Sequence, residues 1–180
     1  MTVEEMLSGG HPNTVGRAWE VVDMLFAQPS RLPELFDCYR SPDEVVRYRA
    51  SRALEDVAAE RPDLLVPYLD RLITEVGALK QASAQQTLAQ LLRTLSAAMT
   101  GAQIGAARRL LADNLENSTD WIVLNATMET LTAWAMRDAE LAAWLRPWLD
   151  YYAGDERRSV ARKAREMLDQ LEGGPAGRRR

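Results

Sequence analysis

A repeat of 38 residues constrains this chain more than any other feature of its sequence. Val46, Ala84, Ile122 and Val160 follow one another at intervals of 38 residues, and each begins a similar pattern of small and apolar side chains at helical spacing. The pattern is clear after Val46, Ala84 and Val160 and weaker after Ile122. A fixed period of this length is typical of stacked helical repeats, because one helical hairpin cannot bury its apolar face alone.

A second series of positions with the same spacing lies in the later half of each repeat. Its members run i, i+1, i+4 and i+5, which is one face of a helix. The series comprises Tyr68, Ala106 and Trp144; Leu69, Ala107 and Leu145; Leu72, Leu110 and Trp148; and Ile73, Leu111 and Leu149. Each repeat is therefore expected to be a pair of helices, A and B. This register predicts Trp144 and Trp148 as filling between helices, and it predicts that five leucines are buried: Leu54, Leu72, Leu92, Leu110 and Leu168.

Turn and capping residues divide the chain at matching places. Ser41, followed by Pro42 and by Glu44 three residues on, predicts a capping box at the start of an A helix. Gly77 predicts the end of the next B helix. We expect helix pairs over residues 13–40, 42–77, 80–116 and 118–153, a short helix near 2–8 with a capping box of Thr2 and Glu5, and a capping helix over 156–172. Alternation with a period of two, the signal of strands, is absent.

The domain organisation is predicted to be simple. We expect residues 1–172 to form one helical domain and residues 173–180 to be a disordered basic tail, because the tail has nothing to bury. The start of the chain lacks the pattern of a signal peptide, and no apolar run is long enough to span a membrane. These features predict a cytoplasmic protein with no membrane partner.

The segment from Ser41 to Leu54 resembles the first helix of a HEAT repeat, most closely the short bacterial HEAT-like type. The matching residues are Asp43, Val46, Arg47, Ala50, Ala53 and Leu54. The resemblance implies an all-α fold over about residues 13–172, a right-handed α-solenoid of about four HEAT-like helix pairs plus a capping helix. It implies little about activity, since such proteins range from scaffolds to a few enzymes.

Residues for metal or nucleophilic chemistry are scarce. His11 is the single histidine and Cys38 the single cysteine, so a transition-metal site lacks ligands and a nucleophilic thiol lacks a partner base. We interpret His11 as a solvated loop residue and Cys38 as a small buried thiol. Phosphate-binding loops and nucleophile elbows are also missing from the sequence. We therefore expect no catalytic residues, no metal and no cofactor.

Arginines recur on the predicted B helices. Arg71, Arg109 and Arg146 each precede an acid by four residues, and Arg108 lies beside Arg109; the acids are Glu75, Asp113 and Asp150. Local ion pairs on a solvated face are one interpretation, each worth about 0.3–0.5 kcal/mol, and reversal of the arginines to Glu then costs little stability. The other is a concave polar groove that binds an acidic or mixed-charge segment of a protein partner.

Trp121 is the remaining candidate for binding. Its counterparts in the other repeats are Val45, Ser83 and Ser159, so we expect it to be partly exposed beside Asp120. HEAT-like alkylpurine DNA glycosylases hold a damaged nucleotide with Trp and Asp, so a DNA-binding, glycosylase-like enzyme is the alternative function. A net charge of −4 disfavours a nucleic-acid partner, because phosphate contacts dominate DNA affinity.

Residues 154–180 carry eight basic and five acidic side chains, a net charge of +3. This surplus is typical either of a surface that contacts RNA, a membrane or an acidic protein, or of a polar cap that keeps the end of a solenoid soluble. The sequence thus predicts a non-catalytic protein–protein interaction scaffold or adaptor with an unidentified protein partner. The candidate partner-binding residues are Arg71, Arg108, Arg109, Arg146 and Trp121.

Overall fold

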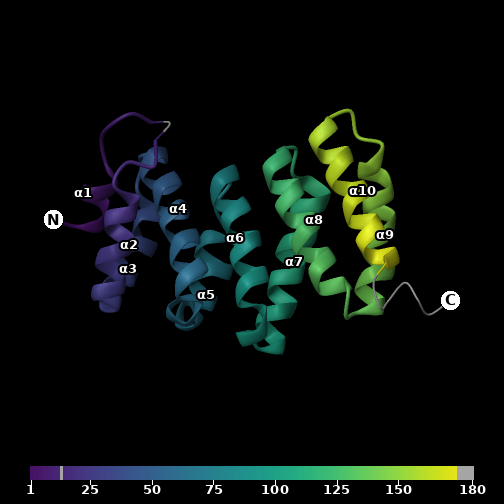
Figure 1. The fold of residues 1–180 in the computed structure, drawn as a ribbon, viewed down its shortest axis with the longest axis horizontal. Helices are drawn as coiled ribbons and strands as arrows, with labels where there is room; N and C mark the ends of the chain where they lie inside the picture. Colours follow the sequence, from purple (N-terminus) through teal and green to yellow (C-terminus); the bar gives the residue numbers. More distant parts are fainter. Residues whose placement is uncertain (13, 174–180) are drawn as a thin grey trace. The chain divides into compact units, whose positions relative to one another are not determined.

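The computed structural model describes residues 1–12 and 14–173, and every regular element in these residues is helical (Figure 1). The all-α prediction is confirmed for this part of the chain. The residues group into two compact units, of which unit 1 is Met1–Gln103 and unit 2 begins at Ile104. The predicted tail begins at Gly173, which is instead the last residue of a helix, and residues 174–180 lie outside the described part.

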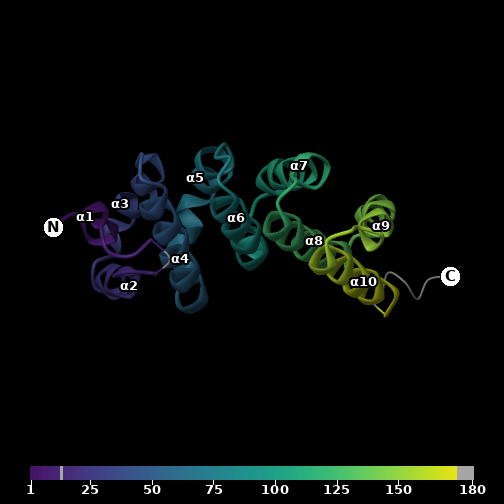
Figure 2. The same cartoon turned by 90° about the horizontal axis from the view of Figure 1, so that it is seen from above.

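Unit 1 contains a short N-terminal helix and the first helix pairs. In order along the chain its elements are α1 (Val3–Leu7), α2 (Ala18–Ala27), η1 (Pro29–Arg31), α3 (Leu32–Asp37), η2 (Cys38–Arg40), α4 (Glu44–Glu60), η3 (Pro62–Tyr68), α5 (Leu69–Arg71), the π-helical η4 (Leu72–Val76), α6 (Ala82–Leu95) and η5 (Ser96–Ala98). Helix α4 lies between α2 and α6 and packs against both (Figure 2). The core of the unit is therefore built around α4, the helix in which the repeat pattern after Val46 lies.

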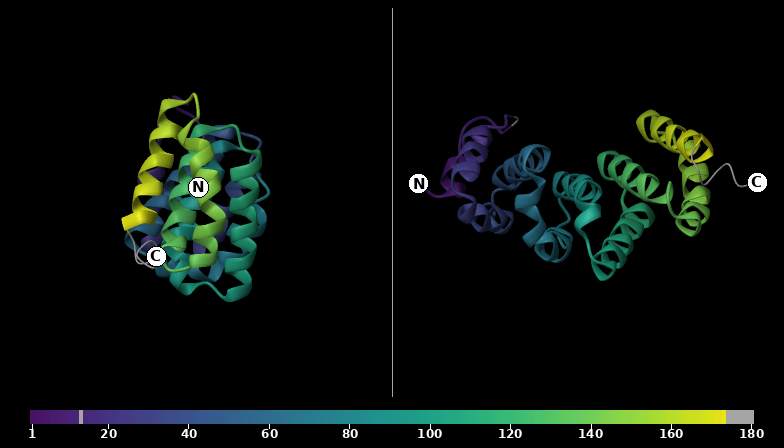
Figure 3. Two further views of the ribbon diagram at one scale, coloured as in Figure 1. Left: turned by 90° about the vertical axis from the view of Figure 1, so that its right-hand side faces the viewer. Right: turned by 60° about the horizontal axis from the view of Figure 1, so that its bottom comes forward.

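Unit 2 contains most of α7 (Gly101–Asn117), followed by α8 (Trp121–Ala135), α9 (Ala139–Ala153) and α10 (Arg158–Gly173). Helices α8, α9 and α10 pack against one another in all three pairings, and α9 and α10 are seen side by side in Figure 3. The hydroxyl of Tyr152 on α9 donates a hydrogen bond to the carbonyl oxygen of Leu115 on α7. This buried contact brings the second helices of two successive pairs together.

The N-terminal caps confirm one sequence prediction and correct another. The capping box of Thr2 and Glu5 is present, with Thr2 N–H donating to Glu5 Oε2 at 2.7 Å and Glu5 N–H donating to Thr2 Oγ1 at 3.2 Å. The prediction for Ser41 is wrong, because Asp43 caps α4 by accepting from Val45 N–H at 2.9 Å. Helix α4 begins two residues later than expected, since Asp43 already satisfies a free amide of its first turn.

The predicted core register holds in part. Leu54, Leu72 and Leu92 are buried as predicted, but Leu110 and Leu168 are only half-buried. In the third and fourth pairs the buried side chains are the next residues, Leu111 and Leu149. The second pair differs because 3-10 and π-helical turns replace a regular α-helix there, which changes the number of residues per turn.

A buried arginine on α4 binds the backbone of the N-terminal loop. The sequence analysis did not predict this contact. Arg49 is 1% exposed, and its guanidinium donates to the carbonyl oxygens of Leu7, Gly9, His11 and Thr14 at 2.5–2.9 Å. Gly16 adopts a φ of +55°, and a Cβ there would lie 2.8 Å from Arg49 Cζ. Only glycine fits this approach, so Arg49 and Gly16 together position the loop.

Candidate functional site

The predicted arginines do not share one environment. Arg71 belongs to unit 1, whereas Arg108, Arg109 and Arg146 belong to unit 2. Arg108 and Arg109 are neighbours on α7, and Arg146 lies on α9. Their surroundings therefore differ from one arginine to the next.

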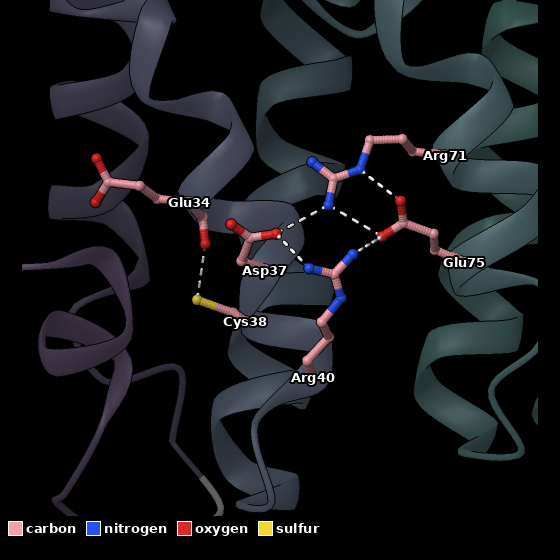
Figure 4. Close-up of polar contacts among 6 residues, drawn as sticks. All are labelled: Glu34, Asp37, Cys38, Arg40, Arg71 and Glu75. Atoms are coloured by element: carbon pink, nitrogen blue, oxygen red, sulfur yellow. Dashed lines mark hydrogen bonds and ion pairs between the residues drawn. The ribbon is translucent and has the colours of Figure 1, made fainter.

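Arg71 belongs to a cluster of four charges in unit 1 (Figure 4). It donates to Glu75 through Nε at 2.8 Å and Nη2 at 3.0 Å, and through Nη2 to Asp37 Oδ1 at 2.9 Å. Arg40 donates to the same two carboxylates, at 3.2 Å to Asp37 and 3.1 Å to Glu75. The predicted pair of Arg71 with Glu75 is confirmed, and its charge is balanced inside the cluster.

The Arg71 side chain is also held by an aromatic ring. Its Cζ lies 5.1 Å from the ring centroid of Phe36, which in turn stacks on Tyr68 at 4.9 Å. The hydrogen bonds from Arg71, with a smaller effect of its charge, lower the pKa of Glu75. Arg71 on α5 thus links α3 to η4, which is a structural role for the residue.

Cys38 lies beside this cluster but takes no part in its chemistry. Its thiol donates to the carbonyl oxygen of Glu34 at 3.3 Å (Figure 4). Burial, reinforced by the neighbouring carboxylates, raises the pKa of Cys38 to about 12. The prediction of a buried thiol is confirmed, and the thiol remains protonated at neutral pH. His11 is exposed in the loop before α2, as predicted.

Arg108 is used to hold the start of α9. Its Nη2 donates to Asp138 Oδ2 at 2.6 Å, while Asp138 Oδ1 accepts from Leu141 N–H at 3.0 Å and caps α9. The hydrogen bond from Leu141, followed by that from Arg108, lowers the pKa of Asp138. Arg108 therefore stabilises a helix terminus rather than pointing freely to solvent.

The ion pairs predicted for Arg109 and Arg146 are wrong. Arg109 is exposed and has no ion pair within the described residues; Asp113 instead accepts from Asn117 Nδ2 at 2.9 Å. Arg146 Nη1 lies 3.4 Å from Glu172 Oε1 on α10 and does not pair with Asp150. Asp113 is therefore bonded within α7, and Arg146 is paired with α10.

Helix α9 carries a row of aromatic side chains, of which Trp144 and Trp148 were predicted to lie in the core. The row comprises Trp144, Trp148, Tyr151 and Tyr152. Adjacent ring centroids are 6.4 Å apart for Trp144 and Trp148, 6.5 Å for Trp148 and Tyr152, and 5.1 Å for Tyr151 and Tyr152. Trp144 is 38% exposed and Tyr151 70% exposed, Trp148 is half-buried, and Tyr152 is buried.

The core prediction for Trp144 and Trp148 is therefore wrong for the first and only partly right for the second. The buried stripe of α9 consists of Leu141, Leu145, Leu149 and Tyr152. Each tryptophan precedes a buried leucine by one residue, which turns its side chain about 100° away around the helix axis. Tyr152 connects the row to α7 through its hydrogen bond to Leu115. Arg146, on the same helix, instead contacts Glu172 of α10. The helical spacing of the aromatics was visible in the sequence, but their exposure was not.

A cavity of about 450 Å³, widely open to solvent, adjoins the end of the row at the turn between α9 and α10. Its lining comprises Tyr151, Gly154, Asp155, Glu156 and Arg157. Asp155 accepts from Arg157 Nε at 2.8 Å and Nη2 at 2.6 Å, and these bonds lower the pKa of Asp155. Arg157 also donates to the carbonyl oxygen of Thr119 at 2.5 Å. The Asp155–Arg157 pair is internally satisfied, which leaves Tyr151 and Glu156 facing the cavity.

A smaller cavity of about 220 Å³ lies beside α4 and α6 in unit 1. Its charged groups already bind within the lining: Glu55 accepts from Thr87 Oγ1 at 2.5 Å and from Arg52 Nη1 at 2.8 Å. The cavity therefore offers a ligand no unpaired charge among these residues.

Trp121 is 53% exposed at the first position of α8, so its predicted partial exposure is confirmed. The neighbouring Asp120 is the N-cap of α8 and accepts from Ile122 N–H at 3.0 Å. This carboxylate therefore has a structural role at the helix terminus.

In residues 1–12 and 14–173, no group of three or more His, Cys, Asp or Glu side chains is arranged to hold a metal ion. Within the same stretch, no helix combines the length and the apolar character needed to cross a membrane. Comparison of the chain with protein-family models, with curated proteins and with solved structures found no match.

Proposed function

We propose that this protein is a non-catalytic interaction module, built as a HEAT-like α-solenoid, that binds a segment of another protein. The solenoid is supported by the 38-residue period and by the succession of helix pairs in both units. In such proteins each pair covers the apolar face of its neighbour, and the outer surfaces of the pairs remain free for partners.

The exposed part of the aromatic row is the observation that carries the proposal. Trp144, Trp148 and Tyr151 follow one another at i, i+4 and i+7 along one flank of α9. Large aromatic side chains are enriched at the centres of protein interfaces and account for much of the binding energy there. Seven residues of α-helix are about 10 Å long, a length that a short extended peptide spans.

The occupant that fits is a peptide segment with an apolar side chain packed on Trp144 and Trp148. The role expected for the arginines changes accordingly. Arg71 and Arg108 are engaged in intramolecular bonds, so they contribute to positioning the helices. Arg109 is exposed on α7 without an ion pair among the described residues, and it is the arginine best able to meet an acid of the partner.

The experiment is selection of a random twelve-residue peptide library, displayed on phage, against the immobilised full chain. Enriched peptides are then synthesised, and their affinities are measured by fluorescence anisotropy. Trp144→Ala and Tyr151→Ala are expected to weaken binding at least about tenfold, which corresponds to about 1.4 kcal/mol. Trp19→Ala is the matched control, because Trp19 is 62% exposed but belongs to unit 1.

All variants are compared by thermal melting, so that a loss of binding is separated from a loss of structure. If the peptides bind the Trp144→Ala variant as tightly as the wild type, the aromatic row is not the binding site. Loss of binding in a Trp121→Ala variant alone would move the site to the start of α8. Failure of the library to enrich any peptide would contradict the proposal.

A further inference from the structure

We infer that the cavity at the turn between α9 and α10 receives a lysine or arginine side chain of the bound segment. The inference rests on the proposed peptide-binding function and specifies the chemistry of the partner. It is carried by the charge of the cavity, by the exposed tyrosine in its wall and by its continuity with the aromatic row.

The cavity lining favours a cation through one carboxylate that is unpaired among the described residues, that of Glu156, although Arg165 is bonded to the carbonyl oxygen of Ala153 next to the lining. Asp155 and Glu156 carry two negative charges and Arg157 one positive charge, so the lining has a net charge of −1. Arg157 is held by Asp155 and by the carbonyl oxygen of Thr119. Glu156 is exposed, and its carboxylate has no hydrogen bond or ion pair within the part of the chain that the structure describes. An incoming cation therefore finds one unpaired carboxylate.

Tyr151 provides the second contact. Its side chain is 70% exposed and lines the cavity, so the ring is accessible to a ligand. The negative face of an aromatic ring attracts ammonium and guanidinium groups, and arginine most often makes such contacts. A carboxylate with an accessible aromatic ring suits a basic side chain better than an acidic or an apolar one. A volume of about 450 Å³ accommodates a guanidinium group together with its remaining water.

The position of the cavity ties this cation to the peptide. Tyr151 belongs both to the cavity lining and to the aromatic row. From Trp144 to Tyr151 the helix rises about 10 Å, which equals about three residues of an extended chain. A segment whose apolar side chain packs on Trp144 and Trp148 therefore reaches the cavity with a basic side chain about three residues away.

The first test uses a single side chain as the probe. N-acetyl-arginine-N-methylamide is titrated into the full chain at low salt, and the amide signals of Gly154 and Glu156 are followed by NMR. The citrulline analogue has nearly the same shape without the charge. We expect saturable shifts with the arginine compound and at least threefold weaker binding of the citrulline compound. Added salt should weaken the arginine binding, because the site is exposed.

Two variants distinguish a contact with the cavity from a general effect of the net charge of the protein. Glu156→Gln should weaken binding of the arginine compound at least threefold. Glu140→Gln is the control, because Glu140 is exposed at the other end of α9 and the substitution removes the same charge. Equal binding of arginine and citrulline, or equal effects of the two substitutions, would overturn the inference.

The second test uses peptides selected on the wild-type chain. Their basic residue three positions from the apolar anchor is replaced by citrulline, and binding to wild type and to Glu156→Gln is compared. We expect the replacement to weaken peptide binding to the wild type at least threefold and to change peptide binding to Glu156→Gln little.

The outcomes separate the two proposals. If Trp144→Ala abolishes peptide binding while citrulline replacement has no effect, the cavity assignment fails and the peptide-binding proposal stands. If Trp144→Ala leaves binding unchanged, the proposed function fails by itself.

Discussion

Arg71 and Arg109 occupy equivalent repeat positions, 38 residues apart, yet the structure uses them differently. Arg71 is held by Asp37 and Glu75 and lies over Phe36. Arg109 is exposed, and the described residues provide it with no ion pair. At the scale of one residue, the role of an arginine depends on the groups that surround it rather than on its place in the repeat.

This contrast predicts different costs for the same substitution. Arg71→Glu brings three carboxylates together and removes the contact with Phe36, so it should lower the free energy of unfolding by about 1–3 kcal/mol. Arg109→Glu should change it by less than about 0.5 kcal/mol, as is usual on exposed surfaces. Urea denaturation of both variants measures the difference. Equal and small effects would show that the charged cluster contributes little.

Helix α9 presents both the aromatic row and one wall of the cavity, and its first turn is held by Asp138. This carboxylate accepts from Leu141 N–H and binds Arg108 of α7. The cap therefore fixes where α9 begins, and the link to α7 limits how the helix is rotated. At the scale of the element, one acidic residue helps to orient the aromatic side chains that lie two to four turns further along.

Replacement of Asp138 tests this role. Asp138→Ala should lower the free energy of unfolding by about 1–2 kcal/mol at pH 7, and Asp138→Asn, which keeps the cap without the charge, by less. The pKa of Asp138 is lowered in the folded state, so its stabilisation is present above the unfolded value of 3.8 and is lost as the pH falls through the folded value. The difference between wild type and Asp138→Ala should therefore shrink below about pH 4. A constant difference from pH 7 to pH 3 would contradict the assignment.

At the scale of the whole molecule, the described residues form two compact units, while the 38-residue period continues through both. Nearest-neighbour packing in repeat proteins lets a short array unfold as one cooperative block. The sequence predicts a single domain over residues 1–172, and a single domain of this size is expected to unfold in one transition. The distribution of tryptophans allows a direct measurement, since Trp19 is in unit 1 and the other four are in unit 2.

We expect the unfolding transitions followed by far-UV circular dichroism and by tryptophan fluorescence to coincide. Leu72 in unit 1 and Leu145 in unit 2 are both fully buried. Leu72→Ala and Leu145→Ala should each cost about 2–5 kcal/mol and shift both signals together. If Leu72→Ala shifts the dichroism signal but leaves the fluorescence transition in place, the two units unfold independently and the prediction of a single domain is wrong.

The sequence alone determined the helical class, the succession of helix pairs and several local features. The box of Thr2 and Glu5, the end of a helix at Gly77 and the burial of Cys38 were predicted correctly. Helical periodicity and capping depend on residues within about one turn of each other, so they can be read directly from the order of amino acids.

The tertiary structure decided which side of each helix is covered and which groups meet. Trp144 lies one residue from the buried Leu145, and only the packing of α9 against its neighbours shows that the tryptophan is exposed. Arg71 binds Asp37 across 34 residues of sequence, and Arg49 binds the carbonyl oxygen of Leu7 across 42. Such pairings depend on how each helix is rotated about its axis and on how far apart the helices lie. When the apolar face of a helix is broad, its 3.6-residue period determines neither the rotation nor the spacing.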